Sequence, residues 1–338
     1  MMAQPEQKTA ASRGDAVVVR SPWRSLVLSF DTKCGAGESD EASAARLESA
    51  LDLAFAYHMQ DMLRHPTLDV DLVNHCNLNC TCCCHYSPIA EPGFLSLDDY
   101  ERDLVLLAKV EGVEEFFDAI CLMGGEPLLH PLLADIVRLT RTHLPKMTIR
   151  LVTNGLLLGD ASTTVWGALR DAGAEILITP YPVGIDYAGL VDLARGQGVR
   201  AVLGGGIATT EEGEAYFLKT PLDETGSQDP AKAFVSCPLA GTTMQLYDRR
   251  IYPCNKGALF DRLNERFGTS FTHEPGDYLE LADIRSAQEI DDFRRTKKPM
   301  CRYCAHGLTE RVVWGKSTRL ADEWLVSHDE CACAARES

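Results

Sequence analysis

Short apolar runs alternate with amphipathic segments along the middle of the chain. The apolar runs have the length of strands, and we expect strands at residues 68–73, 119–123, 148–152, 175–179 and 200–203. Between them, apolar positions recur three and four residues apart, as in helices that bury one face. We expect these helices from Ser96 onward and at residues 131–141, 163–172 and 186–196. This alternation predicts an α/β fold with parallel strands and right-handed crossovers.

The pattern changes toward both ends of the chain. Residues 1–66 read as an N-terminal extension, with a strand at residues 25–30 and a helix at about residues 41–62. After the α/β region, residues 243–252 predict a hairpin with its turn near Asp248 and Arg249. We therefore expect an extension at 1–66, a core at 67–235, a smaller module at 236–310 and a tail at 311–338.

Composition and charge narrow the class of protein. Of 338 residues, 45% are hydrophobic and 24% are charged, which is typical of a globular protein. The net charge of -16 disfavours nucleic acid or an anionic membrane surface as a partner. No apolar run reaches the roughly 18 residues that a membrane-spanning helix needs. We expect a cytoplasmic protein whose 13 cysteines serve metal binding or catalysis rather than disulfides.

One short segment holds cysteines at the CxxxCxxC spacing: Cys76, Cys80 and Cys83. Three thiolates on one loop can hold three irons of a [4Fe–4S] cluster and leave the fourth iron open for a reactant. A structural zinc site with His75 or His85 as the fourth ligand is the alternative. Cys82 and Cys84 lie in the same segment, and an exchange of ligands with either of them stays open.

Two further motifs each follow an expected strand: Gly-Gly-Glu-Pro at residues 124–127 and Thr-Asn-Gly at residues 153–155. In motif, order and spacing the chain resembles the radical S-adenosylmethionine (SAM) superfamily over roughly residues 67–235. The resemblance implies a partial (β/α)6 TIM-like barrel as the core, with the chemistry at the carboxyl ends of the strands.

The resemblance also implies two cofactors at the first cysteine motif, a [4Fe–4S] cluster and SAM bound to its open iron. Glu126, with the backbone of Gly124 and Gly125, would face the SAM ammonium group, since glycines permit close approach and the carboxylate supplies the opposite charge. Thr153 and Asn154 would contact the ribose and the carboxylate. Such enzymes take an electron from a low-potential donor such as flavodoxin or ferredoxin and form a 5′-deoxyadenosyl radical that abstracts hydrogen from a substrate.

Four later cysteines form a second set: Cys237, Cys254, Cys301 and Cys304. Four thiolates can fully ligate a second [4Fe–4S] cluster. The arrangement resembles the twitch domain, a shortened SPASM domain, and implies one auxiliary cluster that transfers electrons. A zinc ribbon would satisfy the same spacing. Cys34, Cys331 and Cys333 have no role that the sequence assigns.

The resemblance implies a hydroxylated small molecule, such as a sugar or an aminocyclitol, as the substrate, with oxidation or epimerisation as the outcome. Epimerisation needs a thiol that donates hydrogen, and Cys121, near the end of a strand, is the candidate. A buried cysteine that packs as a small apolar side chain is the alternative. Maturation of a ribosomally made peptide is another possible activity, although residues 1–66 do not resemble a peptide-recognition module. The last alternative is a non-catalytic zinc-binding protein.

Overall fold

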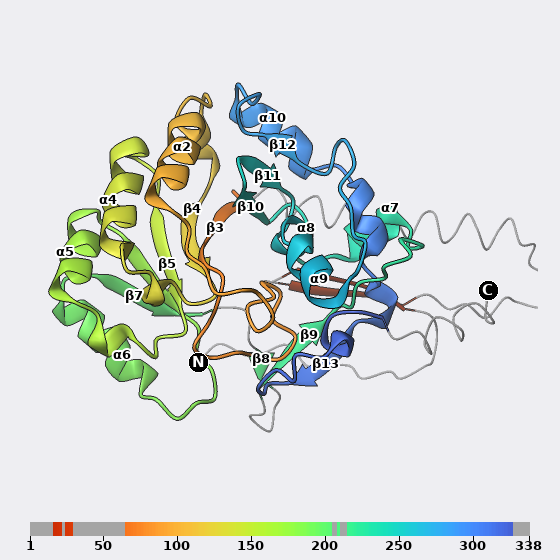
Figure 1. The fold of residues 1–338 in the computed structure, drawn as a ribbon, viewed down its shortest axis with the longest axis horizontal. Helices are drawn as coiled ribbons and strands as arrows, with labels where there is room; N and C mark the ends of the chain where they lie inside the picture. The colour runs from red at the N-terminus through yellow and green to blue at the C-terminus, as the bar shows by residue number, and fades with distance from the viewer. Residues whose placement is uncertain (1–15, 22–23, 30–64, 205–207, 210–214, 327–338) are drawn as a thin grey trace, which may run out of the picture.

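The computed structural model describes residues 16–21, 24–29, 65–204, 208–209 and 215–326 (Figure 1). Its largest element is an eight-stranded sheet in the order β12-β11-β10-β3-β4-β5-β6-β7. The strands are β3 (Thr67–Val73), β4 (Ala119–Gly124), β5 (Ile149–Thr153), β6 (Glu175–Ile178), β7 (Arg200–Leu203), β10 (Thr243–Tyr247), β11 (Arg250–Tyr252) and β12 (Leu279–Glu280). Strands β3 to β7 are parallel neighbours. The expected α/β fold is confirmed, as an open sheet rather than a closed barrel within the described residues.

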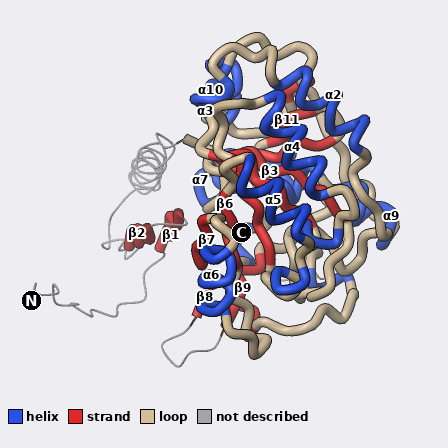
Figure 2. Tube along the Cα trace, turned by 90° about the vertical axis from the view of Figure 1, so that its left-hand side faces the viewer, coloured by secondary structure: helices blue, strands red, loops and turns tan. Residues whose placement is uncertain are grey.

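Helices follow the parallel strands and cover one face of the sheet. They are α2 (Leu97–Leu107), α3 (Val113–Phe116), α4 (Leu133–His143), α5 (Thr163–Asp171) and α6 (Tyr187–Gly196). Figure 2, turned toward this side, shows α4 and α5 in front of the sheet. Ser96 begins α2 as expected, because its side chain accepts a hydrogen bond from the amide of Asp99. The ends of the expected core strands and helices agree with those observed to within two residues.

The two faces of the parallel strands differ in chemistry. Side chains alternate between the faces of a strand. One set is apolar and belongs to the main hydrophobic core with the helices: Leu68, Val70, Leu72, Ile120, Leu122, Ile149, Leu151, Ile176 and Ile178. The alternate positions include Asp69, Asp71, Cys121, Arg150 and Glu175. Strands packed between two helical layers would be apolar on both faces. The polar face is therefore the inner surface of the partial barrel.

The expected hairpin at residues 243–252 is confirmed as β10 and β11. Its turn residues Asp248 and Arg249 have positive φ angles of 46° and 59°, as a tight hairpin turn requires. Strand β10 also pairs in parallel with β3. Strand β10 is thus the sixth strand of the parallel series. In the sheet it lies next to β3, at the opposite end of this series from β7. The parts expected at 67–235 and 236–310 share one sheet.

The remaining described elements surround the cysteine-bearing segments. A three-stranded antiparallel sheet contains β8 (Ala208–Thr209), β9 (Ala215–Lys219) and β13 (Glu310–Val313). The helices are α7 (Pro230–Ser236), α8 (Asn255–Ala258), α9 (Phe260–Phe267) and α10 (Ala287–Arg294). A second hydrophobic core joins Tyr86 and Ile89, which follow the first cysteine motif, to Leu259, Leu263 and Tyr303 of the C-terminal part.

The N-terminal extension is described only as two strands. β1 (Ala16–Ser21) and β2 (Arg24–Ser29) form an antiparallel pair, and β2 accounts for the strand expected at 25–30. The helix expected at 41–62 lies outside the described residues, as do Cys34, Cys331 and Cys333. No helix in the described ranges is long and apolar enough to cross a membrane.

Candidate functional site

The first cysteine motif forms a loop at the carboxyl end of β3. Burial raises the pKa of Cys80 to about 11, and the neighbouring Cys76 adds to the rise. Burial also raises the pKa of Cys83, with contributions from Cys84 and Cys80. Cys80 thus interacts electrostatically with both other thiols of the motif. These cysteines are free thiols.

The geometry of the cysteines bears on the choice between zinc and a cluster. Among the described residues, no three cysteine, histidine, aspartate or glutamate side chains lie close enough together to share one metal ion. Structural zinc gathers four ligands on a single ion. In a [4Fe–4S] cluster each thiolate binds a separate iron, so the sulfurs stand farther apart. A zinc ion and a cluster thus require different spacings of the ligand sulfurs.

The Gly-Gly-Glu turn after β4 packs directly against the cysteine loop. A Cβ on Gly125 would lie 1.9 Å from the carbonyl oxygen of His75. Gly124 has a φ of +117°, and its Cβ would lie 2.6 Å from the Val73 oxygen. The amide of Gly125 donates to Val73 O at 2.7 Å, and the amide of Glu126 donates to His75 O at 3.1 Å. The glycines thus admit the backbone of the cysteine loop, a role that the sequence motif alone did not reveal.

Glu126, Thr153 and Asn154 meet at the ends of β4 and β5. The fully buried Glu126 carboxylate accepts hydrogen bonds from Thr153 Oγ1 at 2.7 Å and from the Asn154 amide at 3.0 Å. Burial raises the pKa of Glu126, although these hydrogen bonds act in the opposite direction. The Asn154 side chain donates to Asn77 at 2.8 Å and lies 3.7 Å from Cys76 Sγ. Asn154 therefore adjoins the first cysteine, and Glu126 is hydrogen-bonded to Asn154.

The second cysteine set also comes together. Burial raises the pKa of Cys301 to about 12, and Cys254 and Cys237 raise it further. The pKa of Cys304 is raised to about 12 by burial, with contributions from Cys301 and Cys237. Cys237 follows α7, Cys254 precedes α8, and the other two lie at a short 3-10 helix. The thiols of this set thus influence one another electrostatically, and the second cluster stays a prediction.

Buried polar residues connect the two cysteine sets. Asn255 Nδ2 lies 3.2 Å from Cys84 Sγ and 3.1 Å from His85 Nε2. His85 Nδ1 lies 2.9 Å from an oxygen of Asp71, which also pairs with Arg262 at 3.3 Å. Burial alone would lower the pKa of His85, but Asp71 and other acidic neighbours raise it to about 9. The buried Asp71 carboxylate is thus paired with two cationic side chains, His85 and Arg262.

Cys121 lies in the middle of β4, away from the cysteine loop. Its strand neighbours are Asp69 and Arg150. Burial raises the pKa of Cys121 well above its usual value, and Asp69 adds to the rise. These contacts place the thiol in the polar layer inside the partial barrel. Its role as a hydrogen donor stays a prediction that its surroundings do not favour.

A segment of the expected tail lies over the first cysteine loop, and sequence reasoning missed it. We call residues 314–324 the C-terminal strap. Trp314 Nε1 donates to Cys80 Sγ at 3.2 Å, and the Trp314 ring lies 6.1 Å from the ring of Tyr181, which follows β6. The sequence of the strap has no motif or spacing from which these contacts could be predicted.

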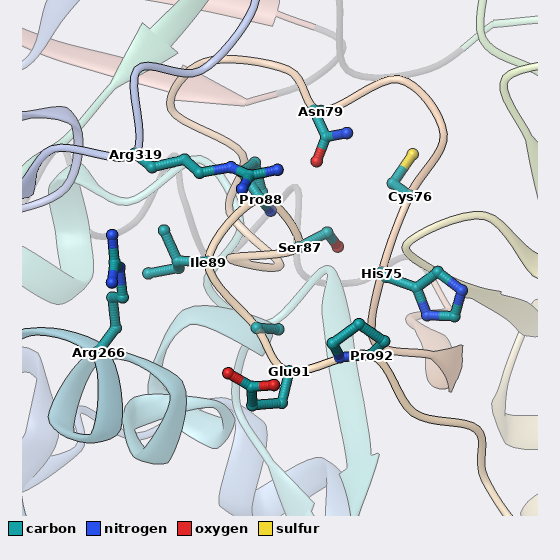
Figure 3. Close-up of a pocket in the computed structure, with 11 residues that line it drawn as sticks. His75, Cys76, Asn79, Ser87, Pro88, Ile89, Glu91, Pro92, Arg266 and Arg319 are labelled. Atoms are coloured by element: carbon teal, nitrogen blue, oxygen red, sulfur yellow. The ribbon is translucent and has the colours of Figure 1, made fainter.

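A cavity of about 330 Å³ opens beside the cysteine loop (Figure 3). His75 and Ser87 line it, and His75 Nδ1 and Ser87 Oγ are buried without a hydrogen-bond partner. Arg266 and Arg319 also line the cavity, and neither forms an ion pair with another described residue. Hydroxyl, imidazole and guanidinium groups can bind hydroxyl-bearing or anionic ligands.

Comparison with known proteins agrees with this site. Residues 70–187 match the Radical SAM superfamily. The chain contains a radical SAM domain. The matched residues include the first cysteine motif, the Gly-Gly-Glu turn, Thr153 and Asn154.

Curated relatives match this chain only in part. A GTP 3',8-cyclase of Rhodopirellula baltica is 29% identical over 179 residues, which are 50% of this chain and 47% of the relative. A GTP 3',8-cyclase of Streptomyces coelicolor is 34% identical over 111 residues, which are 32% of this chain and 30% of the relative. The chain spans about half the length of these relatives, or less.

Solved structures of radical SAM enzymes are more distant. BtrN in complex with AdoMet and 2-DOIA has a TM-score of 0.45 and 19% identity, and the match covers 71% of this chain and 93% of BtrN. Methylornithine synthase (PylB) has a TM-score of 0.34 and 18% identity, with 53% of this chain and 55% of PylB covered. We draw no functional conclusion from likenesses this distant.

Replacing Gly125 with alanine should destabilise the chain, because the added methyl group would overlap the His75 backbone. We expect Gly125→Ala to lower the free energy of unfolding by about 1–3 kcal/mol or more. Gly159→Ala is the matched control, since no atom lies within 4 Å of the position of its Cβ. Urea unfolding of the metal-free proteins measures both. Equal midpoints for the two variants would contradict the packing described here.

Removing the Asp71 carboxylate should leave Arg262 as a buried cation without its ion pair and remove the main charge that keeps His85 protonated. We expect Asp71→Asn to cost about 3–5 kcal/mol of unfolding free energy. Asp192→Asn, which breaks an exposed pair with Arg195, should leave the unfolding midpoint almost unchanged. Chemical denaturation followed by circular dichroism compares them, and a similar small effect of both substitutions would show that the buried pair is not stabilising.

Proposed function

We propose that the chain is a radical SAM enzyme in which Cys76, Cys80 and Cys83 hold a [4Fe–4S] cluster. The observation that carries the proposal is the packing of this loop on the Gly-Gly-Glu turn, with Asn154 3.7 Å from Cys76 Sγ. When bound, the cluster and SAM would supply a 5′-deoxyadenosyl radical that takes hydrogen from a substrate carbon. The residues of the chain bind, orient and shield these groups.

Glu126 is the proposed partner of the SAM ammonium group. Its carboxylate is buried at the end of β4, and burial raises its pKa. A bound cation would compensate this cost by stabilising the charged form. Thr153 and Asn154 hold the carboxylate in place through hydrogen bonds to separate oxygens. Their own contacts with the ribose and the carboxylate of SAM are part of the same proposal.

The proposed substrate is a hydroxylated small molecule that undergoes oxidation or epimerisation. The cavity beside the cysteine loop supports this class because the Ser87 hydroxyl that lines it has no hydrogen-bond partner within the described chain (Figure 3). A phosphorylated hydroxyl compound is the second candidate. Arg266 and Arg319 favour it, and the partly matching relatives are named as enzymes of a nucleotide, GTP.

The second cysteine set is proposed to hold an auxiliary [4Fe–4S] cluster. Its four thiols gather in the C-terminal part, and Asn255 links their neighbourhood to Cys84 of the first loop. A cluster with four cysteine ligands would have no open iron, so electron transfer is its proposed role. The proposed partner is a low-potential donor such as flavodoxin or ferredoxin, in the cytoplasm.

Formation of 5′-deoxyadenosine tests the proposed function. After anaerobic reconstitution with iron and sulfide, the reduced protein should convert SAM to 5′-deoxyadenosine, and Cys80→Ala should abolish the reaction. Glu126→Gln should weaken SAM binding by roughly tenfold or more, because it removes a charged hydrogen-bonding partner.

A control variant tests whether SAM cleavage depends specifically on the first cysteine motif. Cys121→Ala should leave SAM cleavage intact, because Cys121 contacts Asp69 and Arg150 rather than the cysteine loop. It serves as the matched cysteine control for Cys80→Ala. Absence of 5′-deoxyadenosine in the wild-type reaction, or cleavage that persists in Cys80→Ala, would refute the proposed function.

A further inference from the structure

The C-terminal strap pairs with the first cysteine loop through its backbone. Cys80 and Lys316 form an antiparallel bridge. The amide of Thr81 donates to Gly315 O at 2.9 Å. The Lys316 ammonium group reaches the carbonyl oxygen of Leu78 at 2.6 Å. The strap therefore pairs with the loop as a short antiparallel strand would.

Two side chains near the end of the strap also hold the loop. Glu323 accepts hydrogen bonds from the Thr81 hydroxyl and from the Cys82 amide, both at 3.1 Å. Trp324 Nε1 donates to the carbonyl oxygen of Cys83 at 2.9 Å. These contacts hold the segment from Thr81 to Cys83, between the motif's second and third cysteines.

Trp314 differs from these residues because its partner is a sulfur. Its Nε1 donates to Cys80 Sγ at 3.2 Å. An indole N–H can only donate. Cys80 is buried, with 8% of its surface exposed, so little water competes for the sulfur. Tyr181, from the other side of the site, lies against the indole ring and restricts its orientation.

We propose that the strap is part of the first metal site and that Trp314 raises the reduction potential of the cluster held by Cys80. The inference rests on the proposed function, which assigns a cluster to this loop. One-electron reduction by an external donor adds negative charge to the cluster, and part of that charge resides on the ligand sulfurs. A donor to the sulfur stabilises the reduced form, so its loss lowers the potential. Trp314 is a positioning residue, since it acts through Cys80.

The chain offers a matched pair of variants for the test. Trp314→Phe removes the N–H to sulfur, whereas Trp324→Phe removes an N–H to a backbone oxygen of the same loop. A redox titration of each reconstituted full-length protein would follow the electron paramagnetic resonance signal that changes when SAM is added. We expect the equilibrium constant for one-electron reduction of the cluster to be roughly tenfold lower in Trp314→Phe than in the wild type. This corresponds to a reduction potential that is lower by about 59 mV. Trp324→Phe should keep the wild-type potential.

An unchanged potential in Trp314→Phe, or equal shifts in both variants, would overturn the proposal. A second measurement decides the case if either variant fails to retain the cluster. In the metal-free proteins, iodoacetamide labelling followed by peptide mass spectrometry gives the modification rate of each cysteine. Iodoacetamide reacts with the thiolate, which the Trp314 N–H stabilises, so Trp314→Phe should slow the labelling of Cys80 relative to Cys121, and an unchanged ratio would reject the contact.

Failure of this inference is distinguishable from failure of the proposed function. A wild-type protein with no signal that responds to SAM would reject the proposed function. The labelling comparison would still decide whether the Trp314 N–H contacts Cys80. A signal that responds to SAM but keeps its potential in Trp314→Phe would reject only the role of Trp314.

Discussion

The contact between the Gly-Gly-Glu turn and the backbone at His75 positions the rest of the site. Because β3 and β4 are parallel neighbours, the segments that follow them emerge at the same edge of the sheet. The two segments can touch only because Gly125 lacks a Cβ. This single contact sets the cysteine loop at a fixed place relative to Glu126, and through Glu126 relative to the end of β5.

The cysteine loop is also where the core and the C-terminal part meet. The glycine turn supports it from the core, and Asn255 and Arg262 contact it from the helices after the hairpin. The C-terminal strap adds a third support through Trp314 and Glu323. The C-terminal part thus contributes directly to the first cysteine site, which agrees with the continuation of the core sheet by β10.

The sequence predicted the core because its signals are local and periodic. Apolar spacing located the strands and helices, and Gly-Gly-Glu identified the turn after β4, although not its contact with the cysteine loop. The contacts of the strap could not be predicted, because hydrogen bonds between backbone groups leave no pattern of residue types in the sequence. The contact of Trp314 with Cys80 depends on a single N–H group. The ion pairs of Asp71 were equally hidden, since their partners come from distant segments. The position of Cys121 on the strand before the Gly-Gly-Glu motif suggested a role as a hydrogen donor. The sequence did not show that this thiol lies in the polar layer of the sheet.

Mössbauer spectroscopy of the anaerobically reconstituted protein, loaded with ⁵⁷Fe, tests the central claim most directly. The claim is that the first loop supplies three thiolates to a cluster and leaves one iron to a reactant. The account predicts that SAM changes the signal of one iron in a [4Fe–4S] cluster and that this change disappears in Cys76→Ala. A cluster whose irons are all insensitive to SAM, or a protein that retains zinc alone, would contradict it.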